Sequence, residues 1–137
     1  MDALDALLPE ADILVLLVPL NSATENLISR RRFAEMPDGA LVVNAARGGV
    51  LDQDALYDEL VAGRLYAALD VAEPDPLPSE HPLRCAPNLI YTPHIAGMTQ
   101  STLSGTYELI REQLIRLTEG EAPINLHRSG DQRRGGS

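Results

Sequence analysis

Four short runs of apolar residues divide the chain into similar segments. The runs are almost continuously apolar, as expected of parallel strands that are covered by helices on both faces. A run of about four to eight apolar residues, bounded by proline or turn residues, is typical of a buried strand. The predicted strands are residues 13–18, 40–43, 65–69 and 88–91.

Amphipathic segments separate the predicted strands. We expect helices over residues 29–36 and 52–61, the second with Asp52 in position to cap its first turn. A further short helix precedes Pro9, which ends it. Short strands that alternate with helices indicate βαβ units and a parallel sheet with right-handed crossovers. The predicted fold class is therefore α/β.

A long helix is predicted over residues 99–119. Its apolar residues recur at alternating spacings of four and three, which places them on one face of the helix. They are Leu103, Tyr107, Ile110, Leu114 and Leu117. We interpret this stripe as a buried face that packs against the sheet, with a partner domain or a second subunit as the alternative.

The length and composition are those of one globular domain. Of the 137 residues, 45% are hydrophobic and 23% are charged, so the chain has enough apolar surface to form a core. We assign residues 1–126 to this domain. Residues 127–137 are polar and rich in glycine, and we predict that they form a disordered tail.

The charge and the lengths of the apolar runs argue against two classes of partner. A net charge of -9 argues against a nucleic acid, because binding to phosphates depends on clustered cations. The run of residues 30–32, three arginines, is interpreted as the solvated start of a helix rather than as a binding patch. The longest apolar run, residues 13–20, is too short to span a membrane, so we expect no membrane partner.

The cysteine and histidine residues indicate neither a disulfide nor a metal site. Cys85 is the single cysteine, which excludes an internal disulfide and suits a reducing compartment, so we expect a cytoplasmic protein. The three histidines, His81, His94 and His127, are far apart, and their spacing does not match a metal site. We therefore expect no metal.

Charged residues and glycines follow the predicted strands. Arg47 comes after the second strand, Asp70 after the third and His94 after the fourth. Ligands of open α/β sheets bind beside the carboxyl ends of the strands. Each residue alone has an ordinary structural explanation, but their placement along one edge of the sheet indicates an active site. Gly48 and Gly49, next to Arg47, allow a close approach of the backbone.

Three sequence blocks resemble those of a known enzyme family. The blocks are residues 44–52 (NAARGGVLD), 68–71 (ALDV) and 88–97 (NLIYTPHIAG). In order and spacing they resemble the signature blocks of the D-isomer-specific 2-hydroxyacid dehydrogenases, and the resemblance extends over about residues 4–125. It implies the carboxyl-terminal portion of an NAD-binding domain. The expected fold is a partial Rossmann-like parallel sheet of about four strands with flanking helices and a long C-terminal helix.

The resemblance also implies roles for the residues at the strand ends. Arg47 would pair with the carboxylate of a 2-oxo acid and polarise its carbonyl group. His94 would protonate the carbonyl oxygen as hydride arrives, and Asp70 would accept a hydrogen bond from the nicotinamide carboxamide. The residues expected to bind the cofactor are Pro19, Ala45, Ala46, Arg47, Asp70, His94 and Gly97.

One position departs from the family pattern. The family usually has a glutamate five residues after the aspartate that corresponds to Asp70, where it pairs with the histidine, and this chain has Asp75. Because aspartate is one methylene shorter, the pairing needs the loop to move inward or a water to bridge the gap. Glu73 is an alternative partner, and both carboxylates could instead solvate a proline-rich loop. We count Asp75 with Arg47 and His94 as the predicted catalytic residues.

The sequence lacks the G-x-G-x-x-G turn that holds the pyrophosphate of a dinucleotide. We therefore expect part of an oxidoreductase in which residues 13–18 form an exposed sheet edge, available with the long helix for a homodimer. The implied cofactor is NAD, with NADP possible. The implied substrates are small 2-oxo or 2-hydroxy acids such as glyoxylate or hydroxypyruvate. The alternatives are a non-catalytic interaction module and an inactive truncated dehydrogenase.

Overall fold

The computed structural model describes residues 3–125. By its internal contacts the chain divides into two compact units, Met1–Ala96 and Gly97–Ser137, and each is described by itself. The predicted tail, residues 127–137, lies outside the described residues. The assignment of residues 1–126 to a single domain stays a prediction.

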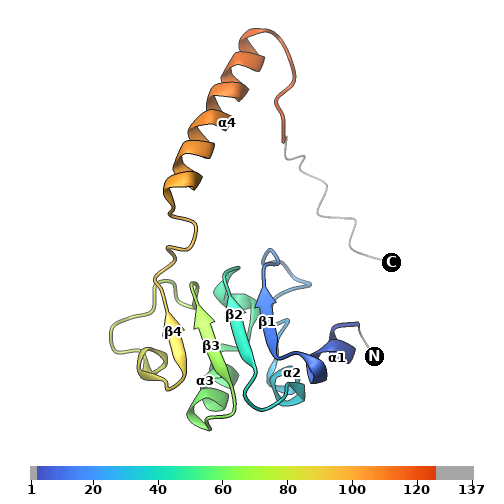
Figure 1. The fold of residues 1–137 in the computed structure, drawn as a ribbon, viewed down its shortest axis with the longest axis vertical. Coiled ribbons are helices and arrows are strands. Elements are labelled where there is room, and N and C mark those ends of the chain that lie inside the picture. The colour runs from blue at the N-terminus through green and yellow to red at the C-terminus, as the bar shows by residue number, and fades with distance from the viewer. Residues whose placement is uncertain (1–2, 126–137) are drawn as a thin grey trace. The chain divides into compact units, whose positions relative to one another are not determined.

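The first unit is built on a four-stranded sheet in the order β1-β2-β3-β4. All neighbouring pairs are parallel, and Figure 1 shows the strands side by side. The strands are β1 (Ile13–Leu16), β2 (Leu41–Asn44), β3 (Tyr66–Leu69) and β4 (Leu89–Tyr91). Each lies within about two residues of its predicted bounds, which confirms the α/β class and the partial Rossmann-like sheet.

The predicted helices lie between these strands. The elements of the first unit are α1 (Ala3–Leu7), η1 (Leu8–Glu10), α2 (Arg30–Glu35), η2 (Gly48–Val50), α3 (Gln53–Val61) and η3 (Pro82–Cys85), where η denotes a 3-10 helix. Helix α3 begins where Asp52 accepts a hydrogen bond from the Ala55 amide at 2.9 Å, as the sequence predicts. Helix α1 gives way to η1 just before Pro9.

Helices α2 and α3 cover one face of the sheet (Figure 1). Because crossovers between parallel strands are right-handed, successive strands added in one direction place both helices on the same side. This side holds the core of the unit. Its buried residues include Phe33, Val42, Leu56, Leu60 and Leu69.

The opposite face of the sheet is apolar and exposed. Ile13 and Val15 on β1 are 60% and 52% exposed, and Ile90 on β4 is 70% exposed. The expectation that residues 13–18 are covered on both faces is therefore wrong for the part of the chain that the structure describes. A continuous apolar run shows that both faces of a strand suit burial, but it does not show that both are covered.

The arginine run opens α2 and is bound within the first unit. Arg31 and Arg32 donate hydrogen bonds to the Asp5 carboxylate at 3.0 and 2.7 Å. Arg30 forms an ion pair with Asp58 at 2.7 Å. The guanidinium groups of Arg32 and Arg31 hold the pKa of the Asp5 carboxyl below its usual value. The run thus connects α2 to both α1 and α3, in keeping with its interpretation as a helix start.

The second unit contains α4 (Gln100–Thr118). Thr99 caps its start by accepting a hydrogen bond from the Thr102 amide at 3.1 Å. No residue of this helix, all of which the structure describes, is buried, and the predicted stripe is among the exposed residues. The packing of this stripe against the sheet or a partner stays a prediction, because an amphipathic pattern shows which face suits burial and not what covers it.

Candidate active site

The carboxyl ends of the four parallel strands form one edge of the sheet, the carboxyl edge. Pro19 follows β1, Arg47 follows β2 and Asp70 directly follows β3. His94 lies three residues after the end of β4. The structure therefore brings these four predicted site residues to the same edge.

A buried asparagine shapes the turn that carries Arg47. Asn44 ends β2 with no exposed surface, and its side chain accepts a hydrogen bond from the Ala46 amide at 3.0 Å. The same side chain donates a hydrogen bond to the Arg47 carbonyl oxygen at 2.9 Å. Asn44 thus closes the turn, and the Arg47 side chain stays exposed. This role was not predicted, although an asparagine at a strand end is a common turn-forming signal.

A hollow of about 520 Å³ lies beside this turn. All but one of its lining residues are apolar, and the exception is a cation. A hollow of this kind suits a flat, weakly polar group next to an anion. It brings together four residues that the sequence predicted to bind a cofactor, Pro19, Ala45, Ala46 and Arg47. The other lining residues are Leu17, Val18 and Leu20.

Gly48 lies directly against the backbone of the segment that follows β3. A Cβ atom at this position would lie 2.2 Å from the carbonyl carbon and oxygen of Ala72 and 2.8 Å from the amide nitrogen of Glu73. Only a residue without a side chain leaves room for this contact. The glycine therefore lets the Arg47 turn touch the loop that follows Asp70.

Asp70 is buried and holds the turn that follows β4. Its Oδ1 atom accepts hydrogen bonds from the Thr92 hydroxyl at 2.6 Å and from the Ile95 amide at 2.9 Å. Its Oδ2 atom accepts one from the Ala96 amide at 3.0 Å. Burial raises the pKa of this carboxyl, but the hydrogen bonds from Thr92, Ala96 and Ile95 outweigh burial and lower the pKa below its usual value. Asp70 is therefore an ionised anchor at neutral pH.

Thr92 was not predicted as a site residue. The sheet register pairs Leu69 with Tyr91, so Asp70 and Thr92 stand side by side just beyond the ends of β3 and β4. The sequence signal that could have indicated this contact is an aspartate and a threonine in matching positions after two neighbouring strands.

His94 has a left-handed backbone conformation, with a φ of 57°. Its amide donates a hydrogen bond to the Asp70 carbonyl oxygen at 2.8 Å, which supports this uncommon conformation. The imidazole Nδ1 atom lies 2.6 Å from the Asp75 Oδ2 atom. Because the imidazole is 49% exposed and the carboxylate 26% exposed, the ring is accessible from solvent while one of its nitrogens is held.

Of the two candidate partners of His94, the structure places Asp75 in contact. The contact is direct, so the loop brings the shorter aspartate side chain to the imidazole. The backbone of Glu73 instead forms two hydrogen bonds with the side chain of Gln53. Gln53 was not predicted as a site residue, because its contact depends on the conformation of a loop 20 residues away in the sequence.

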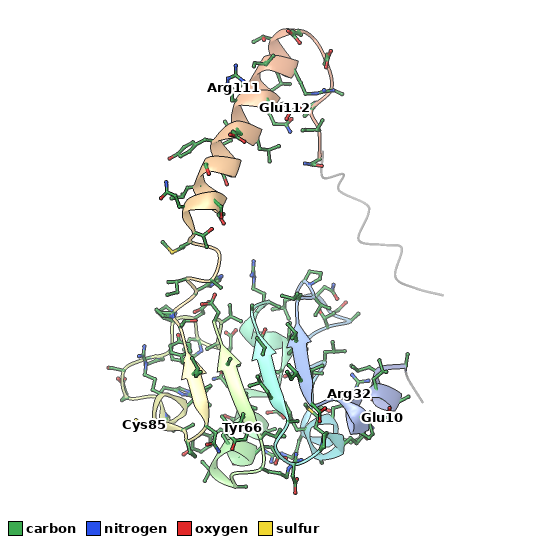
Figure 2. All side chains as sticks on the ribbon, in the orientation of Figure 1. Glu10, Arg32, Tyr66, Cys85, Arg111 and Glu112 are labelled. Atoms are coloured by element: carbon green, nitrogen blue, oxygen red, sulfur yellow. The ribbon has the colours of Figure 1, made fainter. Side chains whose placement is uncertain are left out.

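The remaining predicted or chemically reactive residues do not belong to the group formed by Arg47, Asp70, Asp75 and His94 in the first unit. Gly97 begins the second unit, so its contact with a cofactor stays a prediction. His81 accepts a hydrogen bond from a backbone amide of η3 at 3.2 Å, and His127 lies outside the described residues. Figure 2 shows Cys85 at the end of the sheet where Tyr66 begins β3, away from the carboxyl edge.

Within the described residues, no group of three or more histidine, cysteine, aspartate or glutamate side chains could hold a metal ion. Nor does any helix of residues 3–125 have the length and apolar composition needed to cross a membrane.

The model of one protein family matches the first unit. The D-isomer specific 2-hydroxyacid dehydrogenase NAD binding domain matches residues 1–96, which include Arg47, Asp70 and His94. The chain belongs to this family. The resemblance of its three sequence blocks is thereby confirmed, and the matched part is the family's NAD-binding domain.

Three relatives illustrate the likeness. The chain is 39% identical over 123 residues to glyoxylate/hydroxypyruvate reductase B of Escherichia fergusonii, a match that covers 89% of this chain and 38% of the relative. A D-lactate dehydrogenase with NAD+ from Lactobacillus jensenii is 33% identical with a TM-score of 0.83, over 93% of this chain and 42% of the relative. A D-isomer specific 2-hydroxyacid dehydrogenase from Xanthobacter autotrophicus Py2, in complex with NADPH and MES, is 35% identical with a TM-score of 0.79. This match covers 92% of this chain and 52% of the relative. The chain spans 22% to 38% of the length of the first curated relatives that it matches.

Proposed function

We propose that this chain carries the catalytic residues of an NAD(P)-dependent oxidoreductase that interconverts small 2-oxo acids and 2-hydroxy acids. The observation that carries the proposal is the direct contact of 2.6 Å between the His94 Nδ1 atom and the Asp75 carboxylate. An exposed histidine oriented by a carboxylate is the arrangement of a general acid and base. The similarity to the Escherichia fergusonii reductase favours glyoxylate and hydroxypyruvate as substrates.

His94 supplies and accepts the proton. When both ring nitrogens are protonated, Nδ1 donates to Asp75 and Nε2 is free to donate to the carbonyl oxygen of a 2-oxo acid. After this transfer the neutral ring keeps its Nδ1 proton, because the Asp75 carboxylate accepts a hydrogen bond from this N–H group. In the reverse direction Nε2 takes the hydroxyl proton of the 2-hydroxy acid. Asp75 thereby fixes which nitrogen reacts.

Arg47 binds the substrate carboxylate. Its side chain lines the hollow, and its Nη1 atom donates a hydrogen bond to the Ala46 carbonyl oxygen at 2.6 Å. A guanidinium group has several N–H donors in a planar fork, so the others are available for a carboxylate. In a chain with a net charge of -9, this local cation attracts an anionic substrate to the carboxyl edge.

The residues of the hollow fit the nicotinamide end of a dinucleotide. The apolar lining, with Pro19 and Ala45, suits the face of the ring. The Asp70 Oδ2 atom accepts one protein hydrogen bond and has capacity for a second, which suits an amide donor. When bound, the dinucleotide would supply the hydride to the carbonyl carbon. The G-x-G-x-x-G turn does not occur in this sequence, so the fit concerns the nicotinamide end alone.

A fusion protein tests this function. In the fusion, this chain replaces the matching segment of the Escherichia fergusonii reductase. We expect the fusion to reduce glyoxylate or hydroxypyruvate with NADH. Arg47→Ala should raise KM for the 2-oxo acid by about tenfold or more, because it removes a charge-assisted hydrogen-bonded pair. The matched control is Arg111→Ala in α4, which should leave KM unchanged. A folded fusion that binds NADH and reduces neither acid would contradict the proposal.

We also propose that the chain forms homodimers through the edge of β1 and through α4. Within residues 3–125 the sheet ends at β1, so one side of this strand has backbone groups without a strand partner there. Val15 on β1 and Tyr107 on α4 are exposed apolar residues of the kind found in subunit interfaces. The expected absence of nucleic-acid and membrane partners stays a prediction.

The proposed location is the cytoplasm. Cys85 is the single cysteine of the sequence, and its thiol is free and exposed. A reducing compartment keeps such a thiol from oxidation.

A further inference from the structure

The loop that carries Asp75 is anchored two residues before this aspartate. The Gln53 side chain donates a hydrogen bond from Nε2 to the Glu73 carbonyl oxygen at 2.8 Å. Its Oε1 atom accepts a hydrogen bond from the Glu73 amide at 2.9 Å. One side-chain amide thus binds both polar groups of one backbone residue, which fixes both the position and the direction of the chain at this point.

A second anchor lies two residues after Asp75. The Leu77 amide donates a hydrogen bond to the Tyr91 hydroxyl at 3.0 Å, and the Leu77 carbonyl oxygen accepts one from Arg84 Nη2 at 2.6 Å. The Arg84 guanidinium also lies 5.3 Å from the centre of the Tyr91 ring. The Leu77 side chain is buried in the core. The backbone is therefore held on both sides of Asp75.

Gly48 limits the loop from a third direction. The point where a Cβ atom of Gly48 would lie is 2.8 Å from the Glu73 amide nitrogen, which is the group that Gln53 binds. Gln53 is the first residue of α3 and lies five positions after this glycine. The turn that carries Arg47 and the loop that carries Asp75 are therefore packed against each other, and Gln53 joins this loop to the start of α3.

We propose that Gln53 is a positioning residue for the acid–base pair, which clamps Glu73 so that the Asp75 carboxylate stays within hydrogen-bond distance of His94. This inference rests on the function proposed above. The aspartate side chain has a single methylene group, so its rotation compensates for little movement of the backbone. The Glu73 side of the loop is exposed, and without Gln53 its peptide groups would bind water instead. The loop would then withdraw the carboxylate from the imidazole.

Nitrogen-15 NMR of the histidine rings in the full chain tests this proposal. At a fixed neutral pH, the Nδ1 resonance of His94 reports whether this atom is hydrogen-bonded to a carboxylate. We expect Gln53→Ala to shift the resonance toward its position in Asp75→Asn. We expect the double variant Gln53→Ala/Asp75→Glu to restore it, because the longer side chain spans the gap. The matched control is Gln113→Ala, since Gln113 binds the backbone of Ile124 in the same two-way manner, at 2.9 and 3.0 Å.

An unchanged His94 resonance in folded Gln53→Ala would overturn the proposal, and so would an equal shift in the Gln113 control. If Gln53→Ala does not fold, Gln53→Glu decides, since it keeps the length of the side chain but removes the donor to the Glu73 carbonyl oxygen. The same shift is then expected, and its absence overturns the proposal. The measurement does not depend on turnover. A chain that shows the expected shifts but reduces no 2-oxo acid in the fusion would refute the proposed function alone.

Discussion

At the scale of single residues, one carboxylate holds the turn that presents His94. Asp70 accepts three hydrogen bonds through its side chain, and its carbonyl oxygen accepts one from the His94 amide. An ionised carboxylate accepts all of these bonds, whereas an amide would turn a donor toward one or more of the backbone amides. The charge of Asp70 therefore holds the two residues that follow the left-handed His94.

Asp70→Asn should lower the free energy of unfolding by about 1–3 kcal/mol at neutral pH, because it leaves buried donors unpaired. The pKa of Asp70 is lowered in the folded state, so this carboxylate stabilises the fold above its unfolded-state pKa of about 3.9. Its contribution is lost as the pH falls from there through the folded-state pKa. Urea unfolding between about pH 3 and pH 7 should show the difference between wild type and variant shrinking at the acidic end. The control, Asp54→Asn on the exposed side of α3, should show a smaller difference, and equal effects of both substitutions would contradict this role of Asp70.

Gly48→Ala should destabilise the first unit. The added methyl group would overlap the backbone of Ala72, which cannot turn aside as a flexible side chain can. We expect a loss of about 1–3 kcal/mol in the free energy of unfolding, measured by urea titration. Gly105→Ala in α4 is the control, since the space around Gly105 is open and alanine favours a helix by about 0.5–1 kcal/mol. A Gly48 variant as stable as wild type would show that the Arg47 turn and the Asp75 loop are not in tight contact.

The residues at the strand ends were predictable, and those that support them were not. Arg47, Asp70 and His94 follow three apolar runs, and the geometry of a parallel sheet brings such positions to one edge. Asn44 and Gln53 act through hydrogen bonds to loop backbone, and these bonds exist only once the loops have their folded conformation. Periodicity along the sequence carries no information about such conformations.

At the scale of elements, the apolar runs predicted every strand and the amphipathic segments predicted every major helix that the structure describes. These predictions rest on local properties, namely continuous apolar composition, a capping aspartate and a proline break. The coverage of a face is not a local property. The one incorrect expectation, the doubly covered residues 13–18, concerns what lies against an apolar surface.

The exposed edge at β1 gives a prediction at this scale. Val15→Lys should shift the chain from dimer to monomer in sedimentation velocity, because a lysine on an edge strand opposes pairing with another chain. Val61→Lys is the matched control, since Val61 is similarly exposed at the end of α3, and it should leave the dimer intact. Wild-type protein that sediments as a monomer, or equal effects of the two substitutions, would contradict association through this edge.

At the scale of the whole molecule, we propose that the first unit supplies one side of a dinucleotide site. It matches the NAD-binding domain of the family and forms a hollow that suits the nicotinamide end. The chain spans 22% to 38% of its first curated relatives. The resemblance of the blocks that carry Arg47 and His94 therefore implies a class of reaction, but not the identity of the 2-oxo acid, because specificity depends on every surface that encloses the substrate.

The most direct test of the central claim is the effect of His94→Ala on kcat/KM for hydroxypyruvate in the fusion with the Escherichia fergusonii reductase. If His94 is the general acid, the substitution should lower kcat/KM by about 10²–10⁴-fold. His81→Ala, which removes the other histidine that the structure describes, should leave it unchanged. A His94→Ala fusion that binds NADH and keeps the wild-type rate would contradict the assignment of the proton transfer to this residue.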